Sequence, residues 1–436
     1  MGLMPRKPPQ RTKGPLALRR PSKQAVSNVG SLAAIQVFNS FTPLIAYPFI
    51  LAQVGHEDFA QIVVAEAVAY FLLSLVLYSF EVDGVAAVVG LNARKDSAAI
   101  SAIFVPIMLL RLCLYFIGLL VVQLLLIFFS PDLQTLVLGW SLVALSYAIQ
   151  PNWLFQGMER NFPLAVCVVG SRVCALGSIL LLVRSDTNAN HVPFIIGGWY
   201  VVGAIAALIY AIAHFRLRLH RVSFVTLFDM LWHGKEIYLN SVATGLYRDS
   251  NVLLLSLLGV PAAGIASYSL AEKLTKALQA AMRPLNQFFF PKALAIAKEE
   301  GTPSPAALKR ILAITLPQMG VALALILLGT VAYSIGVRVV DVIQEFNDVQ
   351  VVFQLTLIMA VSVLPGVGVF MLGIAGLNAL GARGYLLIAL FFAAGVSILA
   401  NLLLIPYLGA FASAICFVLS ETLLFGLIVR RFLRQG

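Results

Sequence analysis

The chain has 436 residues, of which 60% are hydrophobic and only 11% are charged, and its formal net charge is +11. Soluble domains carry about 25% charged residues, so the composition excludes a soluble protein and indicates a polytopic membrane protein. The loops between the apolar segments are too short to hold a soluble catalytic domain. Because the basic residues lie mostly in those loops, the net charge reflects membrane orientation and does not indicate nucleic-acid binding.

A basic tail, residues 1–27, precedes the first apolar segment. The first 30 residues include seven lysine or arginine residues and no acidic residue, and prolines interrupt them. The apolar run that follows is too long for the core of a signal peptide. We expect the tail to be disordered and cytoplasmic, where it could also contact anionic headgroups of the membrane lipids.

Twelve segments are long enough to cross the hydrocarbon core as helices. The eighth is so polar that a hydropathy window would miss it, but omitting it would place the basic loop 291–310 outside. The fold class is therefore an all-α polytopic membrane protein with two six-helix lobes, residues 28–220 and 221–436. The predicted spans are residues 31–54, 60–80, 104–129, 133–155, 162–183, 193–214, 237–258, 264–290, 308–333, 351–376, 385–405 and 408–429.

Lysine and arginine are distributed unevenly between the two sides of the membrane that these spans define. With the N-terminus inside, 22 of the 30 basic residues lie in inner loops or tails, and only Arg184 and Arg338 lie outside. The positive-inside rule then places both termini in the cytoplasm.

A weak internal repeat relates the two halves. Residues 49–60 resemble residues 253–264, because in both a span ends at a glycine, Gly55 or Gly259, and four residues precede the next span. Residues 157–160 and 381–383 also resemble each other. Two halves of the same orientation predict parallel repeats, with a binding site near the midplane between them.

Several basic residues lie within the predicted spans. A charge at bilayer depth costs roughly 2.5–3.5 kcal/mol even on the mildest scale, so such residues usually face the bundle interior and mark a substrate path. Three of them have a structural alternative, because Arg172 could tie two helices together, Arg111 could be interfacial and Arg283 could snorkel to the surface. The predicted substrate-binding cations of the lumen are Arg172, Arg248, Lys273, Lys276, Arg111 and Arg283.

Arg248 is the centre of a polar stripe in the seventh span. Asn240, Thr244, Arg248 and Asn251 recur at spacings of three and four, which places them on one helical face. Such a stripe cannot face lipid, so we expect it to line a cavity. A structural pair between Arg248 and Asp249 is the alternative, although neighbours in sequence point about 100° apart on a helix and pair poorly.

Four carboxylates lie within the spans and are candidates for ion coupling: Glu66, Asp249, Glu272 and Glu421. Burial could keep such a group protonated and link proton transfer to substrate release, while a salt bridge to a lumen cation is the equally weighted alternative. Glu272 and Lys276 are four residues apart and can pair on one helix. In the first span, Asn39, Pro43 and Pro48 predict a kinked helix with a polar face, which would suit a gate.

No pattern predicts a metal, a cofactor or a nucleotide site. The four cysteines lie in apolar segments without a C-x-x-C spacing, so they suggest neither a metal nor a disulfide framework. The chain also lacks a G-x-x-x-x-G-K-[ST] motif for ATP. Energy must then come from an ion gradient, from the substrate gradient, or from a polysaccharide polymerase that consumes the product.

The six cations outnumber the four carboxylates within the predicted lumen, which favours an anionic substrate. Arginine binds phosphate oxygens bidentately and lysine acts as a point charge. The diphosphate headgroup of a lipid would suit such a chamber, because its tail could stay in the bilayer while the head crosses inside the protein.

Four stretches resemble the Wzx-type polysaccharide flippases of the multidrug/oligosaccharidyl-lipid/polysaccharide (MOP) exporter superfamily. They are P-L-I-A-Y-P-F-I-L-A-Q-V-G-H-E-D-F-A at 43–60, W-L-F-Q-G-M-E-R at 153–160, S-L-A-E-K-L at 269–274 and F-F-P-K-A-L at 289–294. The resemblance runs from about residue 26, and the basic tail is not a feature of the family. It implies a V-shaped, two-lobed transporter of the inner membrane. By alternating access through a cationic lumen, such a transporter moves undecaprenyl-diphosphate-linked O-antigen or exopolysaccharide units to the periplasmic leaflet.

Three other classes compete with this interpretation. An ion-coupled drug exporter of the same superfamily would share the fold but would favour carboxylates in the lumen. A major-facilitator transporter would show a G-x-x-x-D-R-x-G-R-R-like run, which residues 83–95 do not match. A polymerase or ligase would need a sizeable outer loop with catalytic groups, and the longest outer loop, about 334–350, is too short to fold as a catalytic domain.

Overall fold

The computed structural model describes residues 23–91, 96–339 and 347–434, and in these ranges it is helical without a strand. The first half of the chain forms α1 (Lys23–Leu77), α2 (Phe80–Val88), α3 (Ser97–Phe129), η1 (Pro131–Leu133), α4 (Gln134–Ile149), α5 (Asn152–Gly157), α6 (Asn161–Leu182) and α7 (His191–Phe215). The second half forms α8 (Phe224–Arg248), α9 (Asn251–Leu257), α10 (Ala262–Glu300), α11 (Pro305–Val339), α13 (Asn347–Ala360), α14 (Val363–Gly368), the π-helical η2 (Val369–Leu377), α15 (Arg383–Leu408) and α16 (Ala410–Leu433).

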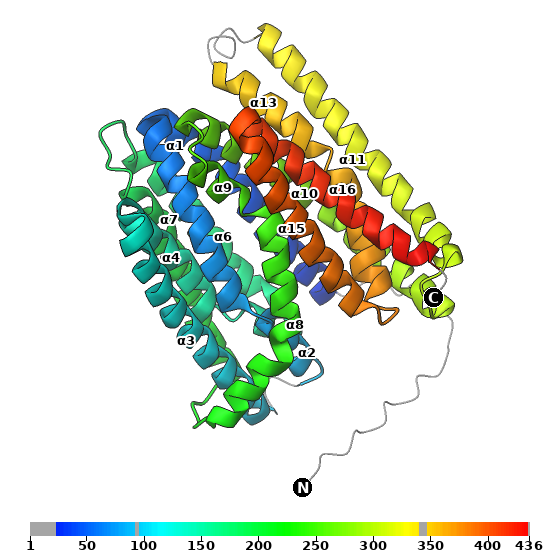
Figure 1. Ribbon diagram of the computed structural model, residues 1–436. Helices are drawn as coiled ribbons and strands as arrows, with labels where there is room; N and C mark the ends of the chain where they lie inside the picture. Colours follow the sequence, from blue (N-terminus) through cyan, green and yellow to red (C-terminus); the bar gives the residue numbers. More distant parts are fainter. Residues whose placement is uncertain (1–22, 92–95, 340–346, 435–436) are drawn as a thin grey trace.

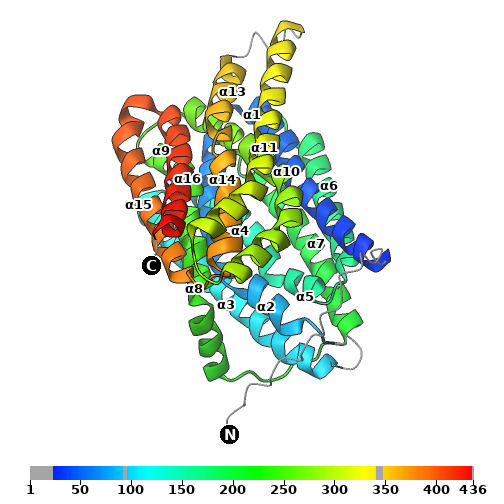
Figure 2. The same ribbon diagram turned by 90° about the vertical axis from the view of Figure 1, so that its right-hand side faces the viewer.

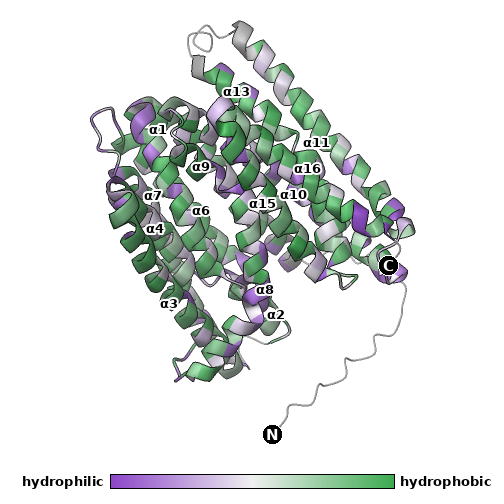
Figure 3. Ribbon diagram, viewed as in Figure 1, coloured by the Kyte–Doolittle hydropathy of each residue, from purple (hydrophilic) through white to green (hydrophobic). Residues whose placement is uncertain are grey.

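The all-α membrane fold with twelve spans is confirmed. Nine segments of the described chain are long and apolar enough to cross a membrane. The longest of them includes α1, which Gly55 divides into two, because its φ of 80° and ψ of 177° belong to a region open only to glycine. The other two spans are α8 with α9, and α10. Their many polar and charged residues make them less hydrophobic than the other nine segments. Figure 3 shows hydrophilic residues along α8, in contrast to the largely hydrophobic α3 and α4.

Three predicted spans are interrupted where the sequence indicated one helix. The tenth breaks between α13 and α14 at Val361 and Ser362 and continues as the π-helical η2. The fourth breaks at Gln150, which is extended because Pro151 follows it. The seventh ends at Arg248 and restarts at Asn251, so the expected polar stripe does not lie on one continuous helix. This break turns Arg248 and Asp249 toward different partners.

The two lobes share one hydrophobic core at one end of the molecule and have separate cores toward the other. The shared core joins Tyr47, Ile50 and Phe59 of α1 to Leu255 of α9 and Tyr268 of α10. One separate core lies mostly among α2–α7 with the start of α8, and the other lies among α8, α10, α11 and α14–α16. The two lobes lie side by side in Figure 1, and in Figure 2 the side of the second lobe that carries α11, α13 and α14 faces the viewer.

The end with separate cores is here called the basic end, because its loops and helix termini carry Arg160, Arg216, Lys298 and Arg430. The opposite end, with the shared core, is called the far end. Among the described loops of the far end, residues 183–190 contribute Arg184. Arg338, Asp341 and Glu345 of the predicted outer loop belong to a region whose side chains lie outside the described residues.

The predicted tail is too long at its C-terminal side. Helix α1 begins at Lys23, so residues 23–27 are helical, whereas residues 1–22 lie outside the described residues. Asn28 anchors this first turn, because its Nδ2 donates to the carbonyl of Glu159 (2.6 Å) and its Oδ1 accepts from the backbone of Asn161 (3.1 Å). The proposed division into lobes at residues 220 and 221 stays a prediction.

The internal repeat has a backbone counterpart. Gly55 and Gly259 both have positive φ, 80° and 71°, where the sequence indicated that equivalent spans end. Gly381 precedes α15 with φ 73°, and Glu159 precedes α6 with φ 52°. Both halves therefore use residues with positive φ at these turns.

Candidate functional site

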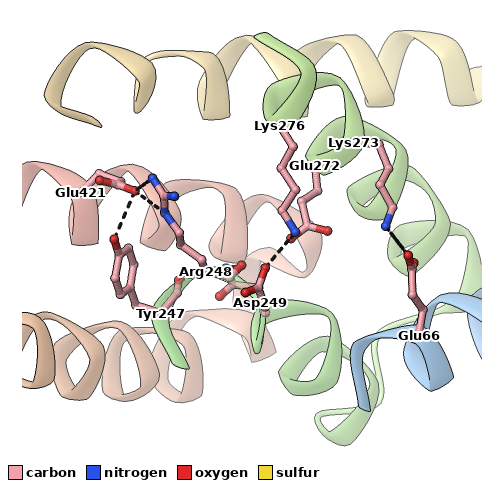
Figure 4. Close-up of polar contacts among 9 residues, drawn as sticks. Glu66, Tyr247, Arg248, Asp249, Glu272, Lys273, Lys276 and Glu421 are labelled. Carbon is pink, nitrogen blue, oxygen red and sulfur yellow. Dashed lines mark hydrogen bonds and ion pairs between the residues drawn. The ribbon is translucent and has the colours of Figure 1, made fainter. Parts of the chain in front are cut away.

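Seven of the predicted site residues meet between the two lobes, and we call them the interlobe cluster. Figure 4 shows their side chains on α1, α8, α10 and α16, together with the segment that follows α8. The cluster consists of Glu66, Arg248, Asp249, Glu272, Lys273, Lys276 and Glu421. Five of the seven line a small cavity shared by α1, α9 and α10, whereas Arg248 and Glu421 are not among its lining residues.

Lys273 and Glu66 form a buried ion pair across the interface between the lobes. The Lys273 Nζ donates to both carboxylate oxygens of Glu66, each at 2.8 Å. The two side chains are 8% and 9% exposed, so water screens this pair little. The sequence left Lys273 without a partner on its own helix, and the structure supplies that partner from α1.

Lys276 is held by two carboxylates. Its Nζ lies 2.8 Å from Asp249 Oδ1 and 3.1 Å from Glu272 Oε1. The predicted pairing of Glu272 with Lys276 is therefore confirmed. Lys276 and Asp249 are each about one third exposed, so this part of the cluster is open to solvent.

Arg248 pairs with Glu421 on α16 and not with its neighbour Asp249. Its Nε donates to Glu421 Oε1 at 2.6 Å, and its Nη2 contacts the same oxygen. Tyr247 Oη also donates to that oxygen at 3.4 Å. Glu421 is fully buried, so its charge depends on Arg248 for compensation.

Arg172 lies in a second, larger cavity inside the first lobe, which we call the N-lobe cavity. This cavity has a volume of about 190 Å³ and is lined by α1, α4, α6 and α7. The Arg172 Nε donates to Asn39 Oδ1 (3.0 Å), Nη1 donates to Ser171 Oγ (3.2 Å), and the guanidinium carbon lies 3.2 Å from the centre of the Tyr200 ring. The two cavities adjoin, because Glu66 and Tyr70 line both.

The structure does not bring Arg111 into either cavity. Arg111 is fully buried, donates to Glu81 Oε1 at 2.7 Å and donates to the carbonyls of Tyr147 and Gln150. It thereby ties α3 to α2 and to the end of α4, which is neither the lumen position nor the interfacial one that the sequence suggested. Arg283 is exposed, and its Nη1 donates to Gln36 Oε1 of α1 at 2.5 Å.

The excess of positive charge expected for the lumen is absent from the interlobe cluster. Three cations face four carboxylates there, and every carboxylate has a cationic partner. Within the part of the chain that the structure describes, Arg172 and Arg283 are the two predicted cations without a carboxylate within 4 Å. The unbalanced positive charge of the site therefore sits in the N-lobe cavity and at the exposed contact with Gln36.

The gate-helix residues line the N-lobe cavity. Asn39 and Pro43 face it, and Pro48 follows one turn later in α1. Helix α1 continues through both prolines, and the non-helical φ and ψ within it occur at Gly55. A kink at Pro43 or Pro48 and a gating role of this helix stay predictions.

Aromatic residues of the N-lobe cavity were not found from the sequence. Tyr47, Tyr70, Tyr147, Tyr200 and Trp140 all line it. Tyr70 follows Glu66 by one helical turn, which was a usable signal, but Tyr200 and Trp140 lie in apolar runs where nothing marked them. In the described residues, no group of three His, Cys, Asp or Glu side chains could hold a metal ion.

The helix arrangement is similar to that of solved membrane transporters. The chain superposes with a TM-score of 0.56 on an inward-facing multidrug resistance MATE family transporter of the MOP superfamily, over 94% of both chains at 14% identity. With the lipid II flippase MurJ in an inward closed conformation, the TM-score is 0.58 over 93% of this chain and 86% of that chain, also at 14% identity. These likenesses establish the fold.

The chain belongs to the polysaccharide biosynthesis protein family, whose model matches residues 25–296. It is 24% identical over 284 residues to an Escherichia coli (strain K12) protein named "Putative O-antigen transporter". That match covers 64% of this chain and 65% of the relative, which is less than two thirds of its length. A Shigella dysenteriae protein of the same name is 25% identical over 71% of this chain and 76% of its own. The resemblance to the MOP polysaccharide flippases is thus confirmed at the level of the family.

Proposed function

We propose that this protein is a flippase that moves a polyprenyl-diphosphate-linked oligosaccharide from the cytoplasmic to the periplasmic leaflet of the inner membrane, with both termini in the cytoplasm. The observation that carries the proposal is the buried interlobe cluster in a chain of the polysaccharide biosynthesis family. A diphosphate headgroup cannot cross hydrocarbon without compensation of its charge. Cations at the interface between the lobes offer that compensation part of the way across.

In this mechanism the diphosphate replaces carboxylates as the partner of the lysines. Lys273 and Lys276 are occupied by Glu66, Asp249 and Glu272 in the empty protein, so the unloaded site is neutralised internally. An entering diphosphate would bind both lysines and release Glu66 from the contact that joins the lobes. Because that contact spans α1 and α10, its release would favour separation of the lobes at the far end.

The displaced carboxylates are the proposed route of ion coupling. A carboxylate that loses its lysine partner inside the protein is easier to protonate, because the charged form is no longer compensated. Glu66, Asp249 and Glu272 would then exchange protons as substrate binds and leaves, while Glu421 would do so only on separation from Arg248. A polysaccharide polymerase that consumes the translocated unit is the expected partner on the periplasmic side.

An ion-coupled exporter of small cationic molecules is a second candidate. The observation in its favour is the balance of the interlobe cluster, where carboxylates outnumber cations. A cationic drug could replace Lys276 beside Asp249 and Glu272. The two candidates differ in the charge of the substrate, and the following experiment separates them.

The test is leaflet translocation by purified protein in proteoliposomes. A polyprenyl-diphosphate oligosaccharide of neutral sugars is supplied, and its exposure is read with a membrane-impermeant lectin, with and without a proton gradient. We expect protein-dependent exposure that falls at least ten-fold in Lys276→Met/Asp249→Asn/Glu272→Gln, which removes the lysine together with both carboxylates that it pairs with. The control Arg310→Ala, which removes an exposed cation paired with Glu299 and Glu300, should translocate normally.

Arg248→Ala alone would leave the buried Glu421 uncompensated, so Arg248→Lys and Arg248→Ala/Glu421→Gln accompany it. Loss of translocation in the balanced double variant, with partial recovery in Arg248→Lys, supports a role in transport. Absence of lectin exposure above empty liposomes under every gradient refutes the flippase. Gradient-driven efflux of a cationic dye under those conditions would establish the second candidate.

A further inference from the structure

The N-lobe cavity has the chemistry of a sugar site, which neither the lysines nor the carboxylates of the interlobe cluster have. Its wall combines aromatic rings, from Tyr47, Tyr147, Tyr200 and Trp140, with the polar groups of Asn39 and Arg172. Aromatic side chains offer flat apolar faces together with a polar edge, and small-molecule sites are mostly apolar with a few placed polar groups. A sugar ring has the matching pattern of apolar faces and a polar rim.

The size of the cavity is compatible with a sugar. A volume of about 190 Å³ has room for several water molecules, and so for at least one sugar ring. The indole Nε1 of Trp140 is already used, because it donates to the carbonyl of Ile62 at 3.0 Å. This hydrogen bond holds Trp140 in place, and Tyr200 carries the Arg172 guanidinium on one face of its ring.

Arg172 adds a requirement for negative charge. Its side chain is only 3% exposed, and among the described residues its contacts are an amide, a hydroxyl and the face of Tyr200, without a carboxylate. Glu66 also lines the cavity, but both of its oxygens accept from Lys273. A buried guanidinium without a counter-charge is costly, and its Nη2 donates no hydrogen bond to a described residue.

We propose that the N-lobe cavity binds one sugar ring together with an anionic group bonded to that ring, and that Arg172 holds the anionic oxygens. The proposal rests on the proposed function, because it names the part of the lipid-linked oligosaccharide that this cavity selects. The anionic group has two possible sources. One is a carboxylate on a sugar unit, and the other is the phosphate bonded to the sugar next to the diphosphate.

The adjoining cavities fit both sources. Glu66 and Tyr70 line both cavities, so a headgroup whose diphosphate lies at Lys273 and Lys276 places the attached sugar beside the N-lobe cavity. Arg172 stacks on Tyr200 and is aligned through Asn39. A guanidinium fixed in this way can bind carboxylate or phosphate oxygens in a defined direction.

The test measures binding of small probes to the full-length protein in nanodiscs. The probes are glucuronate, glucose 1-phosphate, glucose, acetate and inorganic phosphate, each read by saturation-transfer NMR and by displacement. We expect glucuronate or glucose 1-phosphate to bind at least ten-fold more tightly than glucose, acetate and inorganic phosphate. The tighter of the two identifies the source of the charge.

Variants locate the binding in the N-lobe cavity. Arg172→Gln should weaken the preferred probe at least ten-fold, and Arg172→Lys should retain part of the affinity. Arg310→Ala, which removes an exposed arginine paired with Glu299 and Glu300, should bind as the wild type does. Equal binding of glucose and the charged sugars would overturn the proposal. Equal binding of the free anions, or full affinity in Arg172→Gln protein with an unchanged melting temperature, would also overturn it.

The outcome is separable from that of the translocation assay. If the oligosaccharide of neutral sugars is translocated but no charged sugar binds, the sugar site is refuted and the flippase stands. If a charged sugar binds through Arg172 while no lipid is translocated, the site stands and the flippase is refuted. If both hold, Arg172→Gln should slow translocation of a lipid carrying the preferred group more than one lacking it.

Discussion

Replacing Lys273 with methionine should destabilise the protein more than any exposed charge substitution. The change leaves the Glu66 carboxylate, whose side chain is 9% exposed, without a lysine to compensate its charge. Removing one partner of a buried ion pair costs about 3–5 kcal/mol, because the remaining charge stays desolvated. Glu66→Gln should show a comparable loss, since it strands the Lys273 ammonium in the same place.

The double variant Lys273→Met/Glu66→Gln should recover most of that loss. With both charges gone, no desolvated ion remains, and a buried pair replaced by neutral groups is often close to neutral in stability. The unfolding free energy is measured by SDS titration in mixed micelles for the wild type, both single variants and the double variant. We expect the effects to be non-additive by at least about 2 kcal/mol.

The matched control is Arg310→Met. It breaks the ion pair with Glu299, in which the side chains of Arg310 and Glu299 are 47% and 64% exposed. Exposed pairs contribute about 0.2–1 kcal/mol, so this variant should unfold almost as the wild type does. The reasoning is refuted if Lys273→Met costs no more than Arg310→Met, or if the two single effects simply add.

Three further substitutions test the packing and the assignment of Arg111. Gly84→Ala should cost about 1–3 kcal/mol from overpacking, because its new Cβ would lie 2.7 Å from the Trp153 ring. The control Gly198→Ala, whose new Cβ meets nothing within 4 Å, should not destabilise the protein. The melting temperatures of the two variants test this difference. Gly55→Ala should cost roughly 1–3 kcal/mol, since its φ of 80° and ψ of 177° exclude a side chain. Gly30→Ala in the same helix is the control. Equal melting temperatures of the two variants would contradict the strain argument. Arg111→Met should lower the free energy of unfolding by roughly 3 kcal/mol and so lower the yield of folded protein, but translocation per folded molecule should be unchanged. A lower rate per folded molecule would instead indicate that Arg111 takes part in transport.

The sequence predicted the helices and their number well because hydrophobic length is a local property. It also predicted α10 despite its polarity, because the charge of the loop after it required a span there. It did not predict the breaks at Gln150 and at Asp249–Ser250, since helix interruptions inside apolar or mixed segments depend on tertiary partners. The pairing of Glu272 with Lys276 was predictable because both lie on one helix at a fixed spacing.

Pairing across helices was not predictable. Glu66 and Lys273 are 207 residues apart, and Arg248 and Glu421 are 173 residues apart, so nothing local connects them. Counting charges in the spans therefore gave a cationic lumen, while the folded chain neutralises most of those charges internally. Arg172 lies in a cavity, and its role in substrate binding stays a prediction. Among the aromatic residues around it, Tyr200 and Trp140 had no periodic or charged signal.

The shared core at the far end has a consequence for the permeability of the membrane. Packed apolar side chains such as Ile50, Phe59 and Leu255 close the far end to ions and water when no substrate is being moved. In the proposed flippase, each turnover would separate these side chains and expose apolar surface, at a cost of about 25 cal/mol per Å². A larger core would leak less and open more slowly, so in this proposal its size balances leakage of ions against the rate of transport.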